Sequence, residues 1–160
     1  MVKGLFQCNP VKAIHDDYYT RKISWQNIID FIPKDKVIWE PFYSENSDSA
    51  SHLKELGFDV IWKDADFFES NEGQIVVSNC PFSLKKEVLT RLKELNKAFI
   101  LILPSTCLQT KYFKELFEDE KIQIIFPRLK INYDKYVDVK LVEKKDNCSF
   151  YSCYIYLLGN

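Results

Sequence analysis

The residues best suited to chemistry form one short segment, Asn79-Cys80-Pro81-Phe82, directly after an apolar run. The side-chain oxygen of Asn79 and the main-chain carbonyl oxygen of Cys80 are two neighbouring acceptors, and an exocyclic amine has two N–H donors to offer them. Pro81 stiffens the turn, and Phe82 provides an aromatic face on which a flipped base can stack. The segment therefore predicts an amine-binding turn. A helix-capping turn with Phe82 in the core fits the same four residues equally well.

Acidic and aromatic side chains follow two earlier apolar runs of the chain. A carboxylate at the end of a strand can accept hydrogen bonds from ribose hydroxyls or from an ammonium group, and an aromatic ring there can lie against adenine. Acids in such positions also cap helices, so each one taken singly fits a structural role as well. These candidates are Glu40, Phe42, Asp64, Asp66 and Phe67.

The elements that must position these residues alternate between strand and helix patterns. We expect strands at 37–39, 59–62, 74–77, 98–103 and 122–126, and helices at 18–31, 51–56, 84–95 and 107–117. The alternating segments 137–142 and 150–158 predict a late antiparallel pair at the edge of the sheet. The expected fold class is α/β, a single domain over 1–160 with a mostly parallel central sheet, antiparallel C-terminal strands and helices on both faces. In such folds, ligands bind beyond the carboxyl ends of the strands.

In this order, the segments resemble class I S-adenosylmethionine-dependent methyltransferases, specifically the N6-adenine group, whose motif is Asn/Asp-Pro-Pro-Tyr/Phe/Trp. The resemblance implies a Rossmann-like methyltransferase fold, S-adenosylmethionine as cofactor and methyl transfer to adenine in DNA, or less readily in RNA. The four residues that it implies to be catalytic are Asn79, Cys80, Pro81 and Phe82.

The same resemblance implies a set of cofactor-binding residues. The segment 17–20 is similar to the Tyr-Thr-Pro segment of these enzymes, with Arg21 in the place of the proline. Glu40 and Phe42 would begin the methionine-binding loop, and the acids and ring of 64–67 would bind ribose and adenine. The cofactor-binding residues implied in this way are Tyr19, Thr20, Glu40, Phe42, Asp64, Asp66 and Phe67.

Two departures from the family pattern leave alternatives open. The family's cofactor loop is rich in glycine, whereas residues 42–49 contain none, and Cys80 replaces the first proline of the motif. A non-catalytic, methyltransferase-like binding or partner subunit is therefore the alternative function. Methylation of a protein glutamine or of a small-molecule amine would use the same two acceptors.

Composition excludes some classes of protein and leaves others open. A net charge of −1 is not that of a dedicated nucleic-acid coat protein, although 121–145 contains seven Lys and Arg against three acids, which could contact phosphates or form a solvated surface. Five scattered Cys and two His predict neither a metal site nor a disulfide framework. Because no signal peptide or membrane span is evident, we expect a cytoplasmic protein, inside a host cell if it is viral, as its composition and size would suit. A homo- or hetero-oligomer is left open.

Overall fold

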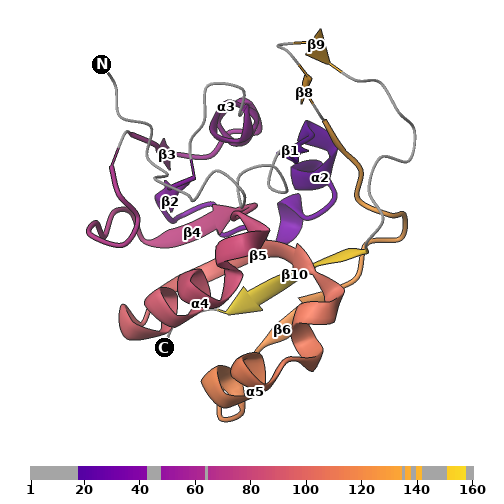
Figure 1. The fold of residues 1–160 in the computed structure, drawn as a ribbon. Helices are drawn as coiled ribbons and strands as arrows, with labels where there is room; N and C mark the ends of the chain where they lie inside the picture. Colours follow the sequence, from indigo (N-terminus) through magenta and orange to yellow (C-terminus); the bar gives the residue numbers. More distant parts are fainter. Residues whose placement is uncertain are drawn as a thin grey trace.

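A six-stranded sheet with the order β3-β2-β4-β5-β10-β6 forms the centre of the molecule in the computed structural model (Figure 1). The structure describes residues 18–42, 48–63, 65–134, 136–137, 140–141 and 151–157. Strands β2 to β5 pair in parallel, and β10 runs antiparallel to both of its neighbours. The strands of this sheet are β2 (Ile38–Trp39), β3 (Val60–Ile61), β4 (Ile75–Ser78), β5 (Ala98–Pro104), β6 (Gln123–Ile125) and β10 (Ser152–Leu157).

Helices cover both faces of the sheet, with α2 and α3 on one side and α4 and α5 on the other (Figure 1). The α-helices are α2 (Lys22–Gln26), α3 (Ser49–Glu55), α4 (Lys85–Glu94) and α5 (Lys111–Phe117). In the described part of the chain, 3-10 helices join them to the strands: η1 (Ile29–Phe31), η2 (Phe82–Leu84) and η3 (Ser105–Gln109).

The two-residue period of β5 divides the apolar core into two clusters. Ile100 and Ile102 pack on the side of α2 and α3, whereas Phe99, Leu101 and Leu103 pack on the side of α4 and α5. All five side chains are buried, as expected for a central strand with both faces covered.

The predicted fold class is confirmed by this arrangement. The strands predicted at 37–39, 59–62, 74–77, 98–103 and 122–126 are all present, and the helices predicted at 51–56 and 84–95 are α3 and α4. Gly57 ends α3 with a φ of 92°, the left-handed conformation that glycine adopts readily.

The predicted pairing of 137–142 with 150–158 is wrong. Within the described residues, the first segment contributes to a separate two-stranded sheet of β8 (Tyr136–Val137) and β9 (Lys140–Leu141). β10 instead lies between β5 and β6 inside the main sheet. All six residues of β10 are buried, and a strand that is buried on both faces belongs in the interior of a sheet rather than at its edge.

The helix predicted over 18–31 is also only partly correct. Tyr19–Thr20 form strand β1, which pairs antiparallel with β7 (Tyr133–Asp134), and the helical part is divided into α2 and η1. The helix predicted over 107–117 is likewise divided, into η3 and α5. Thr110 separates these two parts in an extended conformation, and its side chain accepts a hydrogen bond from the backbone N–H of Phe113.

Candidate active site

The carboxyl ends of three neighbouring parallel strands meet at one edge of the sheet. Glu40 follows β2, Asn79 follows β4, and β5 ends at Pro104. Since β10 runs the other way, its first residue, Ser152, lies opposite Pro104. This edge therefore combines residues from the first half of the chain with residues near its end.

Asn79 occupies the centre of this edge, with its amide in a fixed orientation. Its Nδ2 donates a hydrogen bond to the main-chain oxygen of Tyr18 at 3.1 Å. Its Oδ1 is buried and, within the described part of the chain, has no hydrogen-bond partner. A buried acceptor without a partner is energetically costly, so the hydrogen-bonding capacity of this atom is unmet within the described residues.

The other residues of the tetrapeptide lie directly beside Asn79. The Cys80 side chain is buried in the core on the α4 side. Pro81 precedes η2 with a φ of −54°, and Phe82 is partly exposed and contacts both core clusters. The turn thus also leads into a helix, so the capping interpretation and the amine-binding interpretation are both compatible with its position.

Phe82 is held between two aromatic rings. The ring of Tyr18 stacks on it with 6.5 Å between centroids and an interplanar angle of 23°, and Tyr133 meets it edge-on at 6.3 Å. Tyr18 and Tyr133 contact each other at 5.5 Å. Sequence reasoning did not identify Tyr133, because it lies far along the chain in a segment without a motif.

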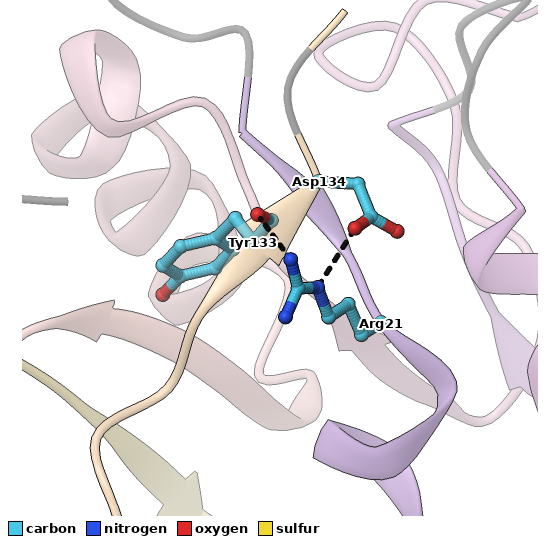
Figure 2. Close-up of polar contacts among 3 residues, drawn as sticks. All are labelled: Arg21, Tyr133 and Asp134. Atoms are coloured by element: carbon cyan, nitrogen blue, oxygen red, sulfur yellow. Dashed lines mark hydrogen bonds and ion pairs between the residues drawn. The ribbon is translucent and has the colours of Figure 1, made fainter. Parts of the chain in front are cut away.

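An ion pair fixes the backbone that carries Tyr18 (Figure 2). Arg21 Nε donates to Asp134 Oδ1 at 2.7 Å, and Arg21 Nη2 donates to the main-chain oxygen of Tyr133 at 3.3 Å. These contacts reinforce the pairing of Tyr19 and Thr20 with 133–134. The predicted cofactor residues Tyr19 and Thr20 are therefore brought next to Asn79, whereas the stabilising contribution of Arg21 and Asp134 was not predicted.

Glu40 is buried and connects three elements through its carboxyl group. Its Oε1 accepts from Ser78 Oγ at 2.5 Å and from the backbone N–H of Phe42 at 3.2 Å, and its Oε2 accepts from Ser49 Oγ at 2.8 Å. Trp25 Nε1 in turn donates to Ser49 Oγ at 3.1 Å. Burial raises the pKa of Glu40 to about 7, although the three hydrogen bonds act in the opposite direction.

The predicted aromatic and acidic cofactor residues differ in their exposure. Phe67 is buried between Trp39 and Phe42, with centroid distances of 5.4 and 5.0 Å. The next ring, Phe68, is exposed and meets Phe67 edge-on at 5.1 Å. Asp66 is exposed, and its Oδ1 accepts from the backbone N–H of Phe68 at 2.8 Å. The accessible ring is thus Phe68, whereas the ring predicted from the sequence to bind the cofactor, Phe67, is buried.

Part of the predicted cofactor site lies outside the described residues. This part comprises Asp64 and residues 43–47 of the glycine-free loop. Among the residues that the structure describes, no group of three or more His, Cys, Asp or Glu is arranged to hold a metal ion. Over the same ranges, no helix is long and apolar enough to cross a membrane.

Comparisons with known proteins give only distant structural similarities. No protein-family model matches the chain, and no curated protein matches it either. Among solved structures, it is similar to a SAM-dependent O-methyltransferase from Thermotoga maritima, with 13% identity and a TM-score of 0.46 over 86% of this chain. It is also similar to the tRNA (m1A58) methyltransferase TrmI from Aquifex aeolicus, with 12% identity and a TM-score of 0.41 over 87% of this chain.

These similarities span only part of the other proteins. The chain covers 64% of the length of the first and 69% of the second. Both TM-scores lie below 0.5. The fold class is therefore assigned from the strand order and strand pairing of this chain.

Proposed function

We propose that this protein is an S-adenosylmethionine-dependent methyltransferase that transfers a methyl group to the N6 amine of adenine in nucleic acid, DNA rather than RNA. The observation that carries the proposal is the buried Oδ1 of Asn79, which is held in place by the Asn79–Tyr18 hydrogen bond and left without a partner among the described residues. An exocyclic amine supplies the donor that this atom lacks.

The residues around Asn79 support the binding of a planar base. Phe82 is partly exposed and is braced by Tyr18 and Tyr133, so its ring is preorganised for stacking. In the proposed mechanism, Asn79 Oδ1 and the Cys80 carbonyl oxygen accept the two N–H groups of the amine and orient its lone pair. The contribution of the protein is mainly positioning and the exclusion of water.

The described residues also fit a methyl donor at the neighbouring strand ends. When bound, S-adenosylmethionine supplies an activated methyl group. Asp66 is exposed and able to accept hydrogen bonds, and Phe68 presents an open ring. Glu40 would act by holding β2, β4 and α3 together, because its oxygens already accept hydrogen bonds from the chain itself.

The test is a labelled-methyl assay of the purified protein with DNA, RNA and protein as separate substrates. We expect label in adenine-containing DNA, and N6-methyladenine after hydrolysis to nucleosides and mass spectrometry. Label in protein alone would refute the nucleic-acid assignment. Label in RNA but not in DNA would refute the choice of DNA.

A second candidate function is a non-catalytic partner subunit. The burial of the Glu40 carboxyl group favours this function. Its carboxyl group is fully enclosed, and the loop that follows it contains no glycine. Calorimetric titration with S-adenosylmethionine separates the two functions. Measurable binding heat supports the enzyme, and its absence at millimolar cofactor supports the partner subunit.

A further inference from the structure

A surface of exposed apolar and basic side chains lies beside the proposed site. It comprises the exposed residues Phe126, Arg128, Leu129 and Tyr151 together with the partly buried Lys130, and we call it the flanking surface. Phe126, Leu129 and Tyr151 are 65%, 77% and 68% exposed, more than any other large hydrophobic side chain in the described ranges. Large apolar side chains are rarely exposed together on a protein surface unless that surface binds something. We therefore expect this surface to contact a partner.

Contacts connect the flanking surface to Phe82 and to the end of β5. Tyr133, which meets Phe82 edge-on, donates its hydroxyl hydrogen to Ser152 Oγ at 2.7 Å. Tyr151 immediately precedes Ser152, and its carbonyl oxygen accepts from the backbone N–H of Ser105 at 2.8 Å, at the end of β5. The flanking surface therefore lies at the same edge of the sheet as Asn79.

The residues of this surface come from the segment after β6 and from Tyr151, the residue before β10. Lys130 Nζ lies 5.0 Å from the centroid of the Tyr151 ring, which joins the two segments. Tyr151 remains exposed despite this contact. Its ring is thus held in position while much of its surface is accessible.

The charge of the segment identifies the kind of partner. No acidic residue occurs from Lys121 to Tyr133, and the acid that follows, Asp134, is ion-paired with Arg21. Cations interleaved with aromatic rings match a nucleic-acid strand, in which phosphates alternate with bases that can stack.

We infer that the flanking surface binds the single nucleic-acid strand on one side of the target base. Tyr151 and Phe126 stack with neighbouring bases, and Arg128 and Lys130 contact phosphates. This inference rests on the proposed function in placing the target base at Phe82, and it adds where the rest of the strand is held.

The test measures strand binding in the absence of cofactor. Fluorescence anisotropy with labelled twelve-nucleotide oligo-dT and oligo-U gives the dissociation constant for the full chain and its variants. We expect Tyr151→Ala to weaken binding about tenfold, the loss of roughly one stacked base. Arg128→Glu should lower the slope of log K against log salt by about 0.7, as for one phosphate contact.

Matched variants at the opposite edge of the sheet serve as controls. Lys34→Glu removes an exposed cation and Phe31→Ala removes a ring that is 48% exposed, both ahead of β2 and outside the basic segment. Both should bind the oligonucleotides as the unaltered protein does. Equal losses in the controls, or no loss in the flanking-surface variants, would overturn the inference.

Two further outcomes separate this inference from the proposed function. If the protein never transfers a methyl group, yet Tyr151→Ala and Arg128→Glu specifically weaken strand binding, the inference stands and the proposed function fails. If adenine is methylated equally well by these variants and by the unaltered protein, the inference fails and the proposed function stands. A dimer that Tyr151→Ala converts to a monomer without any change in strand binding would assign the surface to a second copy and overturn the inference.

Discussion

The Nδ2 of Asn79 donates a hydrogen bond to the main-chain oxygen of Tyr18 at 3.1 Å, and this contact fixes which end of the amide faces the site. With Nδ2 engaged, Oδ1 is the atom left over, and among the described residues nothing donates to it. The bond connects the end of β4 to the segment before β1, 61 positions apart in sequence. The geometry of the proposed acceptor therefore depends on how firmly Tyr18 is held.

The Arg21–Asp134 ion pair holds that segment, and we predict that its loss affects catalysis more than stability. Both side chains are about one-third exposed, so Arg21→Ala should reduce the free energy of unfolding by about 0–1 kcal/mol. Small displacements of a reacting group are costly to rate, and we expect methyl transfer to slow about tenfold with unchanged cofactor affinity. Urea denaturation, single-turnover kinetics and calorimetry provide these values.

A neighbouring ion pair provides the control for Arg21. Lys22 and Glu55 are 2.6 Å apart and more exposed, and they link α2 to α3 rather than β1 to β7. Lys22→Ala should change stability by a similar small amount without slowing methyl transfer. Equal slowing in both variants would mean that the Arg21 pair has no specific effect on the site.

The buried carboxyl group of Glu40 predicts a pH-dependent stability. The folded protein retains this proton up to about pH 7, whereas the unfolded chain releases it near the ordinary value of 4.5. Between these pH values the folded state binds more protons, so stability falls as the pH rises and becomes constant above about pH 7. The total loss is on the order of 3 kcal/mol.

Glu40→Gln separates this effect from that of the other titrating groups. The amide does not titrate, and the hydroxyls of Ser49 and Ser78 can rotate to bond with it. Urea denaturation from pH 4.5 to 8 should show the decrease in the unaltered protein and a flatter profile in Glu40→Gln. Parallel profiles for the two proteins would contradict the assignment to Glu40.

Two glycines with positive φ provide a prediction about packing. Gly73 has a φ of 57°, and a Cβ there would lie 3.0 Å from the Val37 carbonyl oxygen and 3.1 Å from Trp39 Cβ. Gly57 has a φ of 92°, with nothing within 4 Å of such an atom. Both Gly→Ala variants should lose about 1–2 kcal/mol from the left-handed backbone, and Gly73→Ala should lose more because of the contact. Equal losses of unfolding free energy for Gly57→Ala and Gly73→Ala, measured by urea denaturation, would contradict an additional cost from the close contacts at Gly73.

Much of the fold could be predicted from local patterns. The strand at 98–103 and the helix at 84–95 have long and consistent apolar periods, and both are present as β5 and α4. The position of β10 could not be predicted in this way, because an alternating segment indicates a strand but not its neighbours. Its pairing with β5 joins residues 48 to 58 positions apart in sequence, and its pairing with β6 joins residues 29 to 33 positions apart.

The site could be predicted only in part, for a related reason. The prediction for Asn79 comes from its position after an apolar run, and the turn after a strand is a local feature. Tyr18, Tyr133 and the Arg21–Asp134 pair form one unit only through the β1–β7 pairing. Two-residue strands such as these carry too little pattern to be recognised before the fold is known. The difference in exposure between Phe67 and Phe68 also depends on packing, because Phe67 is buried against Trp39 and Phe42.

The most direct test of the central claim is the single-turnover rate of methyl transfer to an adenine-containing oligonucleotide by Asn79→Ala. Asn96→Gly, in the surface turn after α4 where φ is 47°, is the matched control. We predict a rate about 10²–10³-fold lower for Asn79→Ala, the size seen when one positioned hydrogen-bonding group is removed. Cofactor affinity should be nearly unchanged, and Asn96→Gly should react at the unaltered rate. Full activity in Asn79→Ala would contradict the proposal that Oδ1 of Asn79 receives the target amine.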